Sequence, residues 1–272
     1  MSIDAMFAVP PAQLVYAREL SHTAVQWASR AARANLEARA DDSHSNLGWH
    51  EGVQGLVSHP LDDGQRCQLG FSFATGSLVW FVDGDSKALF ALGQADEAAA
   101  RTWCDQQLSA AGLTTTDHAE MPYELDPIDY RGFADAGAKA ALAALGAWYA
   151  KSQSVLDRLV REFSTMAIAT PTVRCWPHHF DLGTLFVLDE DDPETARSVG
   201  VGFSPGDGSY AEPYFYCTPW PTPEALPEAP GPLHWHTEGF TSLVLTASHI
   251  DTASNLDQIL GSAVSAARDS LP

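Results

Sequence analysis

The chain has few basic residues, and this shortage excludes several classes of function. Only 15 lysines and arginines stand against 35 aspartates and glutamates in 272 residues, a formal net charge of -20. Nucleic-acid phosphates and anionic membrane surfaces bind basic faces and repel acidic ones. We therefore expect no nucleic-acid partner and no membrane association.

Paired cysteines and long apolar runs are missing as well. No two of the four cysteines (Cys67, Cys104, Cys175 and Cys217) have C-x-x-C spacing, which disfavours a zinc ribbon or a thioredoxin-like site. No stretch approaches 18 apolar residues, and residues 1–20 lack the basic and apolar regions of a signal peptide. The sequence predicts a cytoplasmic protein with reduced, buried thiols.

Common catalytic and nucleotide-binding motifs are also absent. The chain has no G-x-S-x-G and no G-x-x-x-x-G-K-[ST], and Gly200-Val201-Gly202 lacks a third glycine at dinucleotide-binding spacing. These absences disfavour an α/β-hydrolase, a P-loop nucleotidase and a nicotinamide-dependent oxidoreductase.

Helical and β patterns occur twice in the same order. Apolar residues at helical spacing predict helices over residues 12–38, 96–111, 133–163 and 256–268. Apolar runs between turn signals predict strands over 53–58, 66–74, 77–82, 180–188, 198–203, 214–218 and 241–247. We expect an α+β fold of two similar helix–strands–helix halves, residues 1–130 and 131–272, in one pseudo-symmetric unit with an antiparallel sheet covered by helices.

Glycine and proline mark the expected turns and loops. Thr75-Gly76 and Asp83-Gly84-Asp85 predict tight turns, and Gly112 predicts a helix C-terminus. An extended, proline-punctuated connector follows at residues 121–127. The six prolines of Thr218–Pro232 predict an extended surface loop, because proline interrupts both helices and central strands.

Several short motifs follow one another along most of the chain. They are Gly55-Leu56-Val57, Gly70-Phe71-Ser72-Phe73, the segment Trp103 to Pro127, Phe180-Asp181-Leu182, Gly202-Phe203-Ser204-Pro205-Gly206 and Glu212-Pro213-Tyr214-Phe215-Tyr216. Together they resemble a bacterial family known only as a domain of unknown function. The resemblance implies one intact architecture and no particular activity. This chain has His178 and His179 where that family has small or aromatic residues before Phe-Asp-Leu.

The pattern His234-x-His236-x-Glu238 is the main chemical signal. In an extended segment these three side chains point to one face, so both imidazoles reach one zinc or iron ion. Glu238 would be a third ligand or a general base for hydrolysis. His178, His179 and Asp181 are candidates to complete the site or to orient its ligands.

Two other interpretations of these residues stay open. The histidines could instead belong to a metal-free, non-catalytic pocket with apolar walls from second-half aromatics, chiefly Trp176, Tyr214, Tyr216 and Trp235. The chain could also be a scaffold without a pocket. From Cys175 onward, 14 acidic residues face two arginines, so we expect a neutral or cationic ligand rather than an anion. Whether the protein is an enzyme is left open by these patterns.

Overall fold

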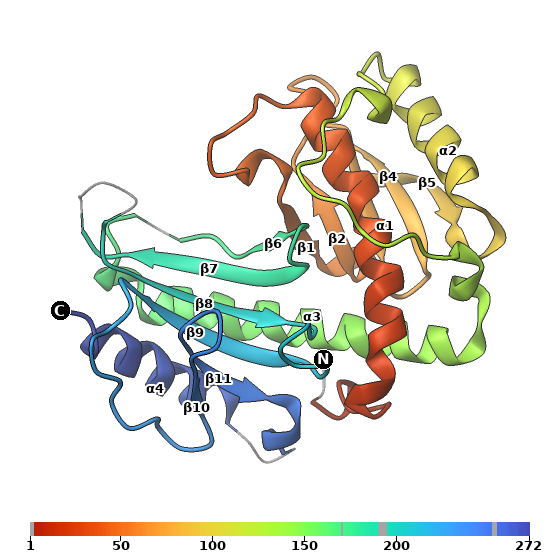
Figure 1. Cartoon of the computed structure of the whole chain (residues 1–272). Helices are drawn as coiled ribbons and strands as arrows, with labels where there is room; N and C mark the ends of the chain where they lie inside the picture. Colours follow the sequence, from red (N-terminus) through yellow and green to blue (C-terminus); the bar gives the residue numbers. More distant parts are fainter. Residues whose placement is uncertain (1–2, 170, 190–194, 252–254) are drawn as a thin grey trace. The chain divides into compact units, whose positions relative to one another are not determined.

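The structure is a computed structural model that describes residues 3–169, 171–189, 195–251 and 255–272 (Figure 1). These residues form four α-helices and eleven strands, and the strand pairs are antiparallel. The helices are α1 (Leu14–Asn35), α2 (Glu97–Ala110), α3 (Ala136–Glu162) and α4 (Leu256–Asp269). The expectation of a mixed α+β fold with antiparallel pairing is confirmed.

The chain divides into two compact units. Unit 2 comprises Ala5–Ala150 and Cys175–Phe180, whereas unit 1 comprises chiefly Lys151–Arg174 and Asp181–Pro272. The change of unit falls inside α3, between Ala150 and Lys151, which is 20 residues beyond the 130/131 division expected from the sequence.

Unit 2 contains a meander of antiparallel strands. In the order β6-β1-β2-β3-β4-β5, it holds β6 (Arg174–Trp176, without its first residue, which belongs to unit 1), β1 (Leu47–His50), β2 (Gly55–Ser58), β3 (Gln68–Ser72), β4 (Ser77–Val82) and β5 (Asp85–Ala91). Asp83 and Gly84 join β4 to β5 with φ of 53° and 83°. Two successive positive φ values give the turn whose twist suits a two-residue hairpin, so the turn prediction is confirmed.

Helix α1 packs on β2 and β3 of this unit. Apolar residues on its sheet-facing stripe recur every three or four positions, at Leu14, Ala17, Leu20, Ala24, Ala28 and Ala31. Residues 24–29 are all buried, so in its middle the helix is covered on more than one side. Beside this stripe, Phe71, Phe73 and Tyr149 form a cluster of buried rings. The Tyr149 hydroxyl donates to the Phe180 carbonyl over 2.5 Å, which ties the 175–180 segment to the core of unit 2.

Helix α2 has the ends that its sequence predicts. Asp96 accepts a hydrogen bond from the Ala99 N–H over 2.8 Å and caps the N-terminus. Gly112 follows the C-terminus with φ of 74°, a conformation that glycine adopts without strain. The chain then continues as an extended segment beside α1.

Unit 1 contains the remaining strands and α4. In the order β10-β11-β9-β8-β7, it holds β10 (His234–His236), β11 (Ser242–Thr246), β9 (Tyr214–Trp220), β8 (Ser198–Ser204) and β7 (Asp181–Val187). Helix α4 packs on β8 and β9 through Leu256, Leu260, Ala263, Val264 and Ala267.

Three local predictions need correction. Strand β9 continues through Pro219 to Trp220 rather than giving way to a loop at Thr218. Proline has no N–H to donate to a neighbouring strand. It is tolerated at position 219 because the pairing of β11 with β9 extends only as far as Cys217, so no residue of β11 is opposite Pro219. Strands β1, β5 and β6 were not predicted, since β1 and β6 have only four and three residues and β5 is a polar, largely exposed edge strand. The segment before β7 is a turn and not extended, because Phe180 has φ of 57°.

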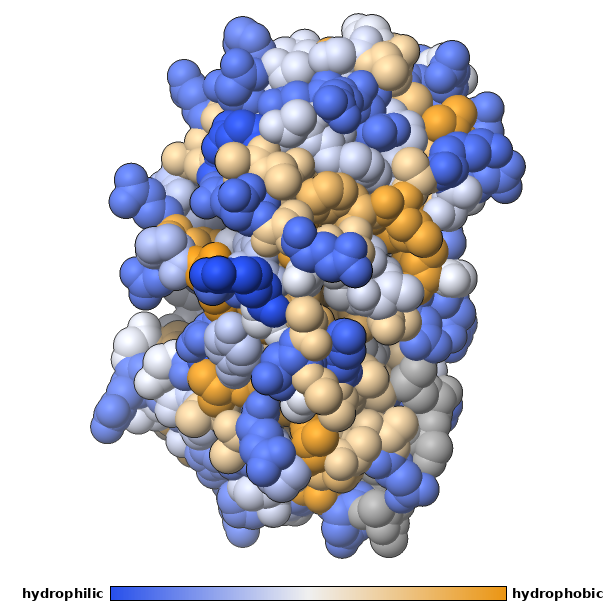
Figure 2. Space-filling model, turned by 90° about the vertical axis from the view of Figure 1, so that its right-hand side faces the viewer, coloured by the Kyte–Doolittle hydropathy of each residue, from blue (hydrophilic) through white to orange (hydrophobic). Residues whose placement is uncertain are grey.

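A few large apolar side chains are exposed at the surface. Leu89, Ile168 and Leu185 are more than half exposed. On the face shown in Figure 2, hydrophilic residues are interspersed among the apolar ones. No helix in the described ranges is long and apolar enough to cross a bilayer.

Candidate functional site

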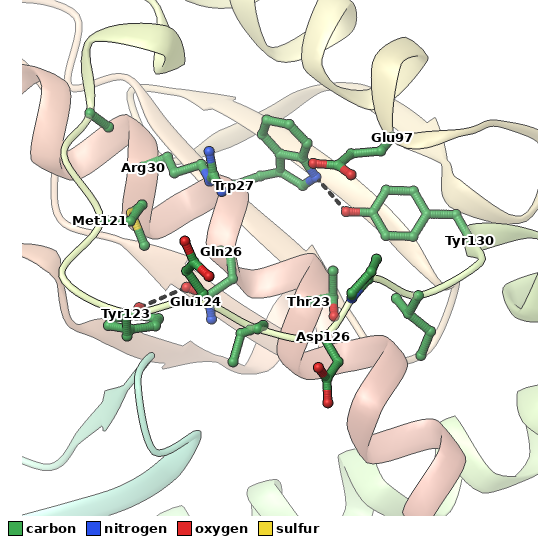
Figure 3. Close-up of a pocket in the computed structure, with 14 residues that line it drawn as sticks. Thr23, Gln26, Trp27, Arg30, Glu97, Met121, Tyr123, Glu124, Asp126 and Tyr130 are labelled. Atoms are coloured by element: carbon green, nitrogen blue, oxygen red, sulfur yellow. Dashed lines mark hydrogen bonds between the residues drawn. The ribbon is translucent and has the colours of Figure 1, made fainter.

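A pocket of about 430 Å³ lies within unit 2, between α1 and the extended segment 119–130 (Figure 3). The start of α2 adds Glu97 to its wall. Its other lining residues are Thr23, Gln26, Trp27 and Arg30 from α1, and Ala119, Met121, Tyr123, Glu124, Leu125, Asp126, Pro127, Ile128 and Tyr130 from the connector. All belong to one unit, so the pocket is complete within it.

The helical wall follows from the spacing of its residues. Thr23, Gln26, Trp27 and Arg30 stand at positions i, i+3, i+4 and i+7, which lie on one stripe of a helix. The opposite wall is extended because Pro122 and Pro127 interrupt helical hydrogen bonding. A polar and aromatic helix stripe thus faces a strand-like segment.

Gln26 holds the connector in place. Its side chain is 6% exposed, and its amide oxygen accepts a hydrogen bond of 2.7 Å from the Tyr123 hydroxyl. Its amide nitrogen donates to the carbonyls of His22 and Pro177, each over 2.9 Å. All hydrogen-bonding atoms of this side chain are therefore occupied by protein groups, which makes Gln26 a structural support rather than a ligand-binding group.

Trp27 and Tyr130 form the buried end of the pocket. The indole N–H of Trp27 donates to the Tyr130 hydroxyl over 2.9 Å. Burial raises the pKa of Tyr130 to about 12, so its phenol is neutral at physiological pH. The guanidinium groups of Arg30 and Arg101 lie 5.6 and 5.5 Å from the Trp27 ring centroid, within the range of a cation–π contact.

The charged groups of the pocket lack partners within the described structure. Neither Arg30 nor the carboxylates of Glu97, Glu124 and Asp126 form an ion pair or hydrogen bond with a described residue. Figure 3 shows Glu97 extending towards Trp27, whereas Asp126 points away from the other labelled side chains. The pocket therefore presents one half-buried cation beside several free anions.

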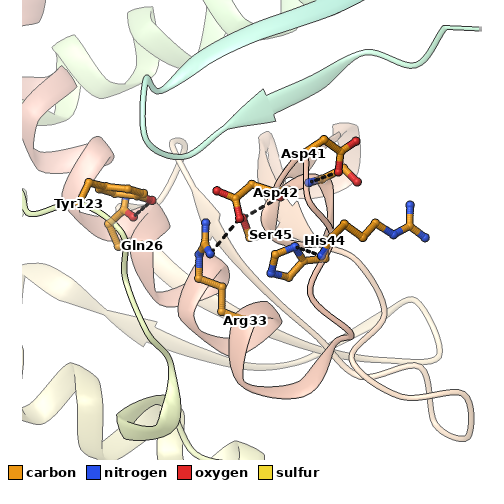
Figure 4. A network of polar contacts seen from close by, with 9 residues as sticks. Gln26, Arg33, Asp41, Asp42, His44, Ser45 and Tyr123 are labelled. Carbon is orange, nitrogen blue, oxygen red and sulfur yellow. Dashed lines mark hydrogen bonds and ion pairs between the residues drawn. The ribbon is translucent and has the colours of Figure 1, made fainter. Parts of the chain in front are cut away.

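A second polar network surrounds the C-terminal end of α1 (Figure 4). Arg33 pairs with Asp42 over 3.1 Å, and the buried His44 accepts a hydrogen bond of 3.2 Å from the Arg39 N–H through Nδ1. Burial and the neighbouring Arg33 lower the pKa of His44. These contacts join side chains to the 39–45 turn, so they fix the exit of α1.

The predicted residues His234 and His236 converge on a third group. His234 Nε2 lies 2.8 Å and His236 Nδ1 lies 3.0 Å from the hydroxyl oxygen of Tyr210. His236 Nε2 lies 2.7 Å from the Glu238 carbonyl oxygen, which only accepts, so Nε2 carries a proton. In neutral His236, Nδ1 then accepts from Tyr210, and the Tyr210 oxygen accepts from His234.

The three residues of this cluster are half-buried, and two of them have shifted pKa values. Burial, then His249 and His236, lowers the pKa of His234. Burial and the carboxylates of Asp207 and Glu238 raise the pKa of Tyr210. Glu238 contacts His236 through its main-chain carbonyl, and its carboxylate is on an exposed residue, so the predicted base lies outside the hydrogen-bonded set.

The other predicted residues of unit 1 have separate partners. Tyr216 donates to the carboxylate of Asp181, and Tyr214 donates to that of Asp207 over 2.5 Å. The indole of Trp235 donates to the Pro227 carbonyl over 2.7 Å. Tyr214 is only 4% exposed. These aromatics thus serve the packing and hydrogen bonding of unit 1, and the pocket found in unit 2 contains none of them.

The remaining predicted residues lie in unit 2. The rings of His178 and His179 are 4.1 Å apart and both residues are exposed, and Trp176 lies 6.2 Å from His178. The four imidazoles of the predicted metal set are therefore distributed over both units. Within the described ranges, no group of three or more His, Cys, Asp or Glu side chains is placed to hold a metal ion. A zinc or iron site at the predicted residues stays a prediction.

The pocket residues were missed by the sequence patterns, although one signal was present. Thr23, Gln26 and Arg30 form a polar stripe on α1, and Trp27 lies within that stripe. A stripe that faced only water would not need a tryptophan. A large buried aromatic within a polar stripe indicates that another segment covers it. The connector from residue 119 to 130 is that segment.

Comparison with protein-family models, with curated proteins and with solved structures finds no match to this chain.

Proposed function

We propose that the protein binds a small zwitterionic or amine-bearing organic molecule in the pocket between α1 and residues 119–130. The observation that carries this proposal is the unpaired guanidinium of Arg30, which lies on Trp27 in a pocket whose other sides contain Glu97 and Glu124. A ligand carboxylate would pair with Arg30, since guanidinium groups bind carboxylates through two hydrogen bonds. A ligand ammonium would pair with the acidic side chains.

Charge and shape limit the ligand further. Asp126 points away from the other labelled side chains, so Glu97 and Glu124 are the carboxylates to set against Arg30. The Arg101 guanidinium also lies on Trp27, and these charges together favour a molecule of about zero net charge. Tyr123 is half-buried and supplies aromatic surface against which an apolar or cationic part of the ligand can pack, whereas Trp27 and Tyr130 are almost fully buried. A cavity of about 430 Å³ suits a molecule of metabolite size.

Isothermal titration calorimetry of the full chain with a panel of amino acids, amines and carboxylic acids tests the proposal. We expect saturable binding of amino acids or amines and none of simple dicarboxylic acids. Arg30→Gln should weaken binding of carboxylate-bearing ligands, because it removes their charged partner. Glu97→Gln should weaken amine binding.

Matched controls are available on the same unit. Arg39→Gln and Glu37→Gln remove the same charges from exposed residues near the end of α1 and should leave affinity unchanged. If no member of the panel binds, or if Arg30→Gln and Arg39→Gln behave alike, the proposal fails.

We place the protein in the cytoplasm as part of the same proposal. All four cysteines are free and buried, which agrees with a reducing compartment. Detection of the mature protein in a periplasmic or secreted fraction would contradict this location.

We also retain the two similar halves as a proposal. In unit 2, α1 packs on β2 and β3 of an antiparallel meander, and in unit 1, α4 packs on β8 and β9 of another. A common origin requires that β2–β4 and β7–β9 superpose strand by strand, together with their helices, in an experimental structure. Failure of that superposition would remove the duplication.

A further inference from the structure

We propose that Tyr210, His234 and His236 of unit 1 bind one divalent transition-metal ion, with zinc as the first candidate. This site differs from the one expected from the sequence, because a tyrosine replaces His178, His179 and Asp181 as the further ligand. It is independent of the pocket in unit 2.

The positions of the three donor atoms carry the inference. His234 Nε2 and His236 Nδ1 lie 2.8 and 3.0 Å from the Tyr210 hydroxyl oxygen. Metal bonds of about 2.0–2.1 Å also place neighbouring ligand atoms about 3 Å apart. An ion can therefore replace the two hydrogen bonds with small rotations of the three side chains.

A hydrogen bond behind the site orients one ligand. His236 donates its Nε2 proton to the Glu238 carbonyl over 2.7 Å, which leaves Nδ1 as the lone-pair nitrogen that faces Tyr210. Metal-binding histidines characteristically donate their other ring N–H to a carbonyl or carboxylate in this way. The tautomer that His236 needs for ligation is thus already selected.

Tyr210 is also held in position. Its backbone N–H donates to the carboxylate of Asp207 over 3.0 Å. The backbone N–H of Ser209, in the same turn, donates to the same carboxylate. The negative charges of Asp207 and Glu238 act on Tyr210 and would offset the charge of the ion. Tyr210, His234 and His236 are all half-buried, so an ion can reach them from solvent.

Binding through the phenolate releases one proton. The O–H bond of Tyr210 breaks, the oxygen keeps the electron pair and binds the ion, and the proton passes to the buffer. His234 donates through Nε2 in the metal-free protein, so its proton moves to Nδ1 by exchange with solvent and Nε2 then binds the ion with no further net release. Imidazole suits zinc, copper, iron and nickel, and three protein ligands leave room for water on zinc. The described residues contain no group of three His, Cys, Asp or Glu side chains placed to hold a metal ion. The site proposed here has only two such side chains and a tyrosine, so that finding does not test it.

Calorimetric titration of the chelator-treated full chain with zinc chloride tests the site. We expect one equivalent to bind, with proton release that shows as a heat dependent on the buffer. Tyr210→Phe and the double variant His234→Ala/His236→Ala should each weaken zinc binding by about tenfold or more. With copper as the probe, wild type should show a phenolate-to-copper charge-transfer band that Tyr210→Phe lacks.

The double variant His178→Ala/His179→Ala is the matched control. It removes two exposed histidines from unit 2 and should leave zinc affinity unchanged. Weaker binding in this control, unchanged binding in Tyr210→Phe, or no stoichiometric zinc in wild type overturns the proposal. Because the double variant at 234 and 236 could unfold, circular dichroism accompanies each titration, and Tyr210→Phe, which keeps the ring, remains decisive.

Discussion

The indole N–H of Trp27 donates a hydrogen bond of 2.9 Å to the hydroxyl of Tyr130, 103 residues further along the chain. Trp27 is 2% and Tyr130 3% exposed, so water does not substitute for either partner. This bond joins α1 to the end of the segment that forms the opposite wall of the pocket. The pocket therefore depends on a contact between two distant parts of unit 2.

Tyr130→Phe should lower the free energy of unfolding by about 1–3 kcal/mol, because it leaves a buried N–H without an acceptor. Urea denaturation measures the loss. Tyr16→Phe is the control, since Tyr16 is 44% exposed, and it should change stability by less than about 0.5 kcal/mol. Equal stabilities of the two variants would show that the Trp27 contact contributes nothing.

Stability should fall as the pH is lowered from about 6.5 to about 4, because of His22. Burial lowers the pKa of His22 to about 4, against its ordinary value of 6.5, while Nε2 donates to the Pro177 carbonyl over 2.8 Å. Between these values the unfolded chain binds the proton and the folded chain does not. The free energy of unfolding therefore falls with decreasing pH, by about 3 kcal/mol from this group.

The variant His22→Phe isolates this contribution. The Phe180 ring, which stacks on His22 at 5.1 Å, can stack on phenylalanine instead, and Gln26 still donates to the Pro177 carbonyl. We expect urea denaturation between pH 7.5 and 4.5 to show a smaller loss of stability in this variant than in wild type. His118→Phe, at an exposed position, should retain the wild-type pH dependence, and parallel curves for wild type and His22→Phe would disprove the assignment.

Local periodicity explains most of the elements that the sequence predicts. The apolar stripe of α1 and the two turns around Gly76 and Gly84 depend on neighbouring residues alone, and all three are present. Strand β5 was missed because an exposed edge strand need not alternate apolar and polar residues. The pocket was missed because its walls meet only after residues 119–130 fold back along α1.

The histidine prediction shows the same limit within one motif. His234 and His236 do share a side of an extended segment, since both contact Tyr210. Tyr210 itself lies 24 residues before His234, in a turn whose place depends on the register of β9 and β11. The supposed common face of His179 and Asp181 fails because Phe180, between them, has φ of 57° and breaks the alternation of an extended chain.

The native protein should react slowly with thiol reagents at pH 8. Burial, together with a hydrogen bond to Asp62, raises the pKa of Cys67 to about 11, and burial raises the pKa of Cys104 and Cys217 further. The thiolate is the reactive form, so little of it is present. Colourimetric titration should detect four thiols in denaturant and none rapidly in buffer.

A cysteine placed on the surface supplies the positive control for that titration. Ser209→Cys puts a thiol on the exposed 207–209 turn, and one equivalent should react within the mixing phase of the native assay. Rapid reaction of any native cysteine would contradict the burial of all four.

Gly202 should not tolerate a larger side chain, because the ring of Tyr216 lies across it. The two residues are directly opposite in β8 and β9, and Gly183 is opposite Gly202 on the other side in β7. This row of two glycines gives Tyr216 room to reach the carboxylate of Asp181. An added Cβ at Gly202 would lie 2.8 Å from the Leu182 carbonyl oxygen and closer still to the Tyr216 hydroxyl and ring.

Gly202→Ala should therefore destabilise unit 1 by about 1–3 kcal/mol, because a backbone carbonyl in a paired strand cannot move aside cheaply. Gly208→Ala is the matched control: no atom lies within 4 Å of its added Cβ, and we expect a change of less than about 0.5 kcal/mol. Urea denaturation measures both. Tyr216→Phe should lose the bond to Asp181 but keep the ring over the glycines. If Gly202→Ala is as stable as Gly208→Ala, the glycines are not required by the tyrosine, and the strand pairing alone positions Asp181.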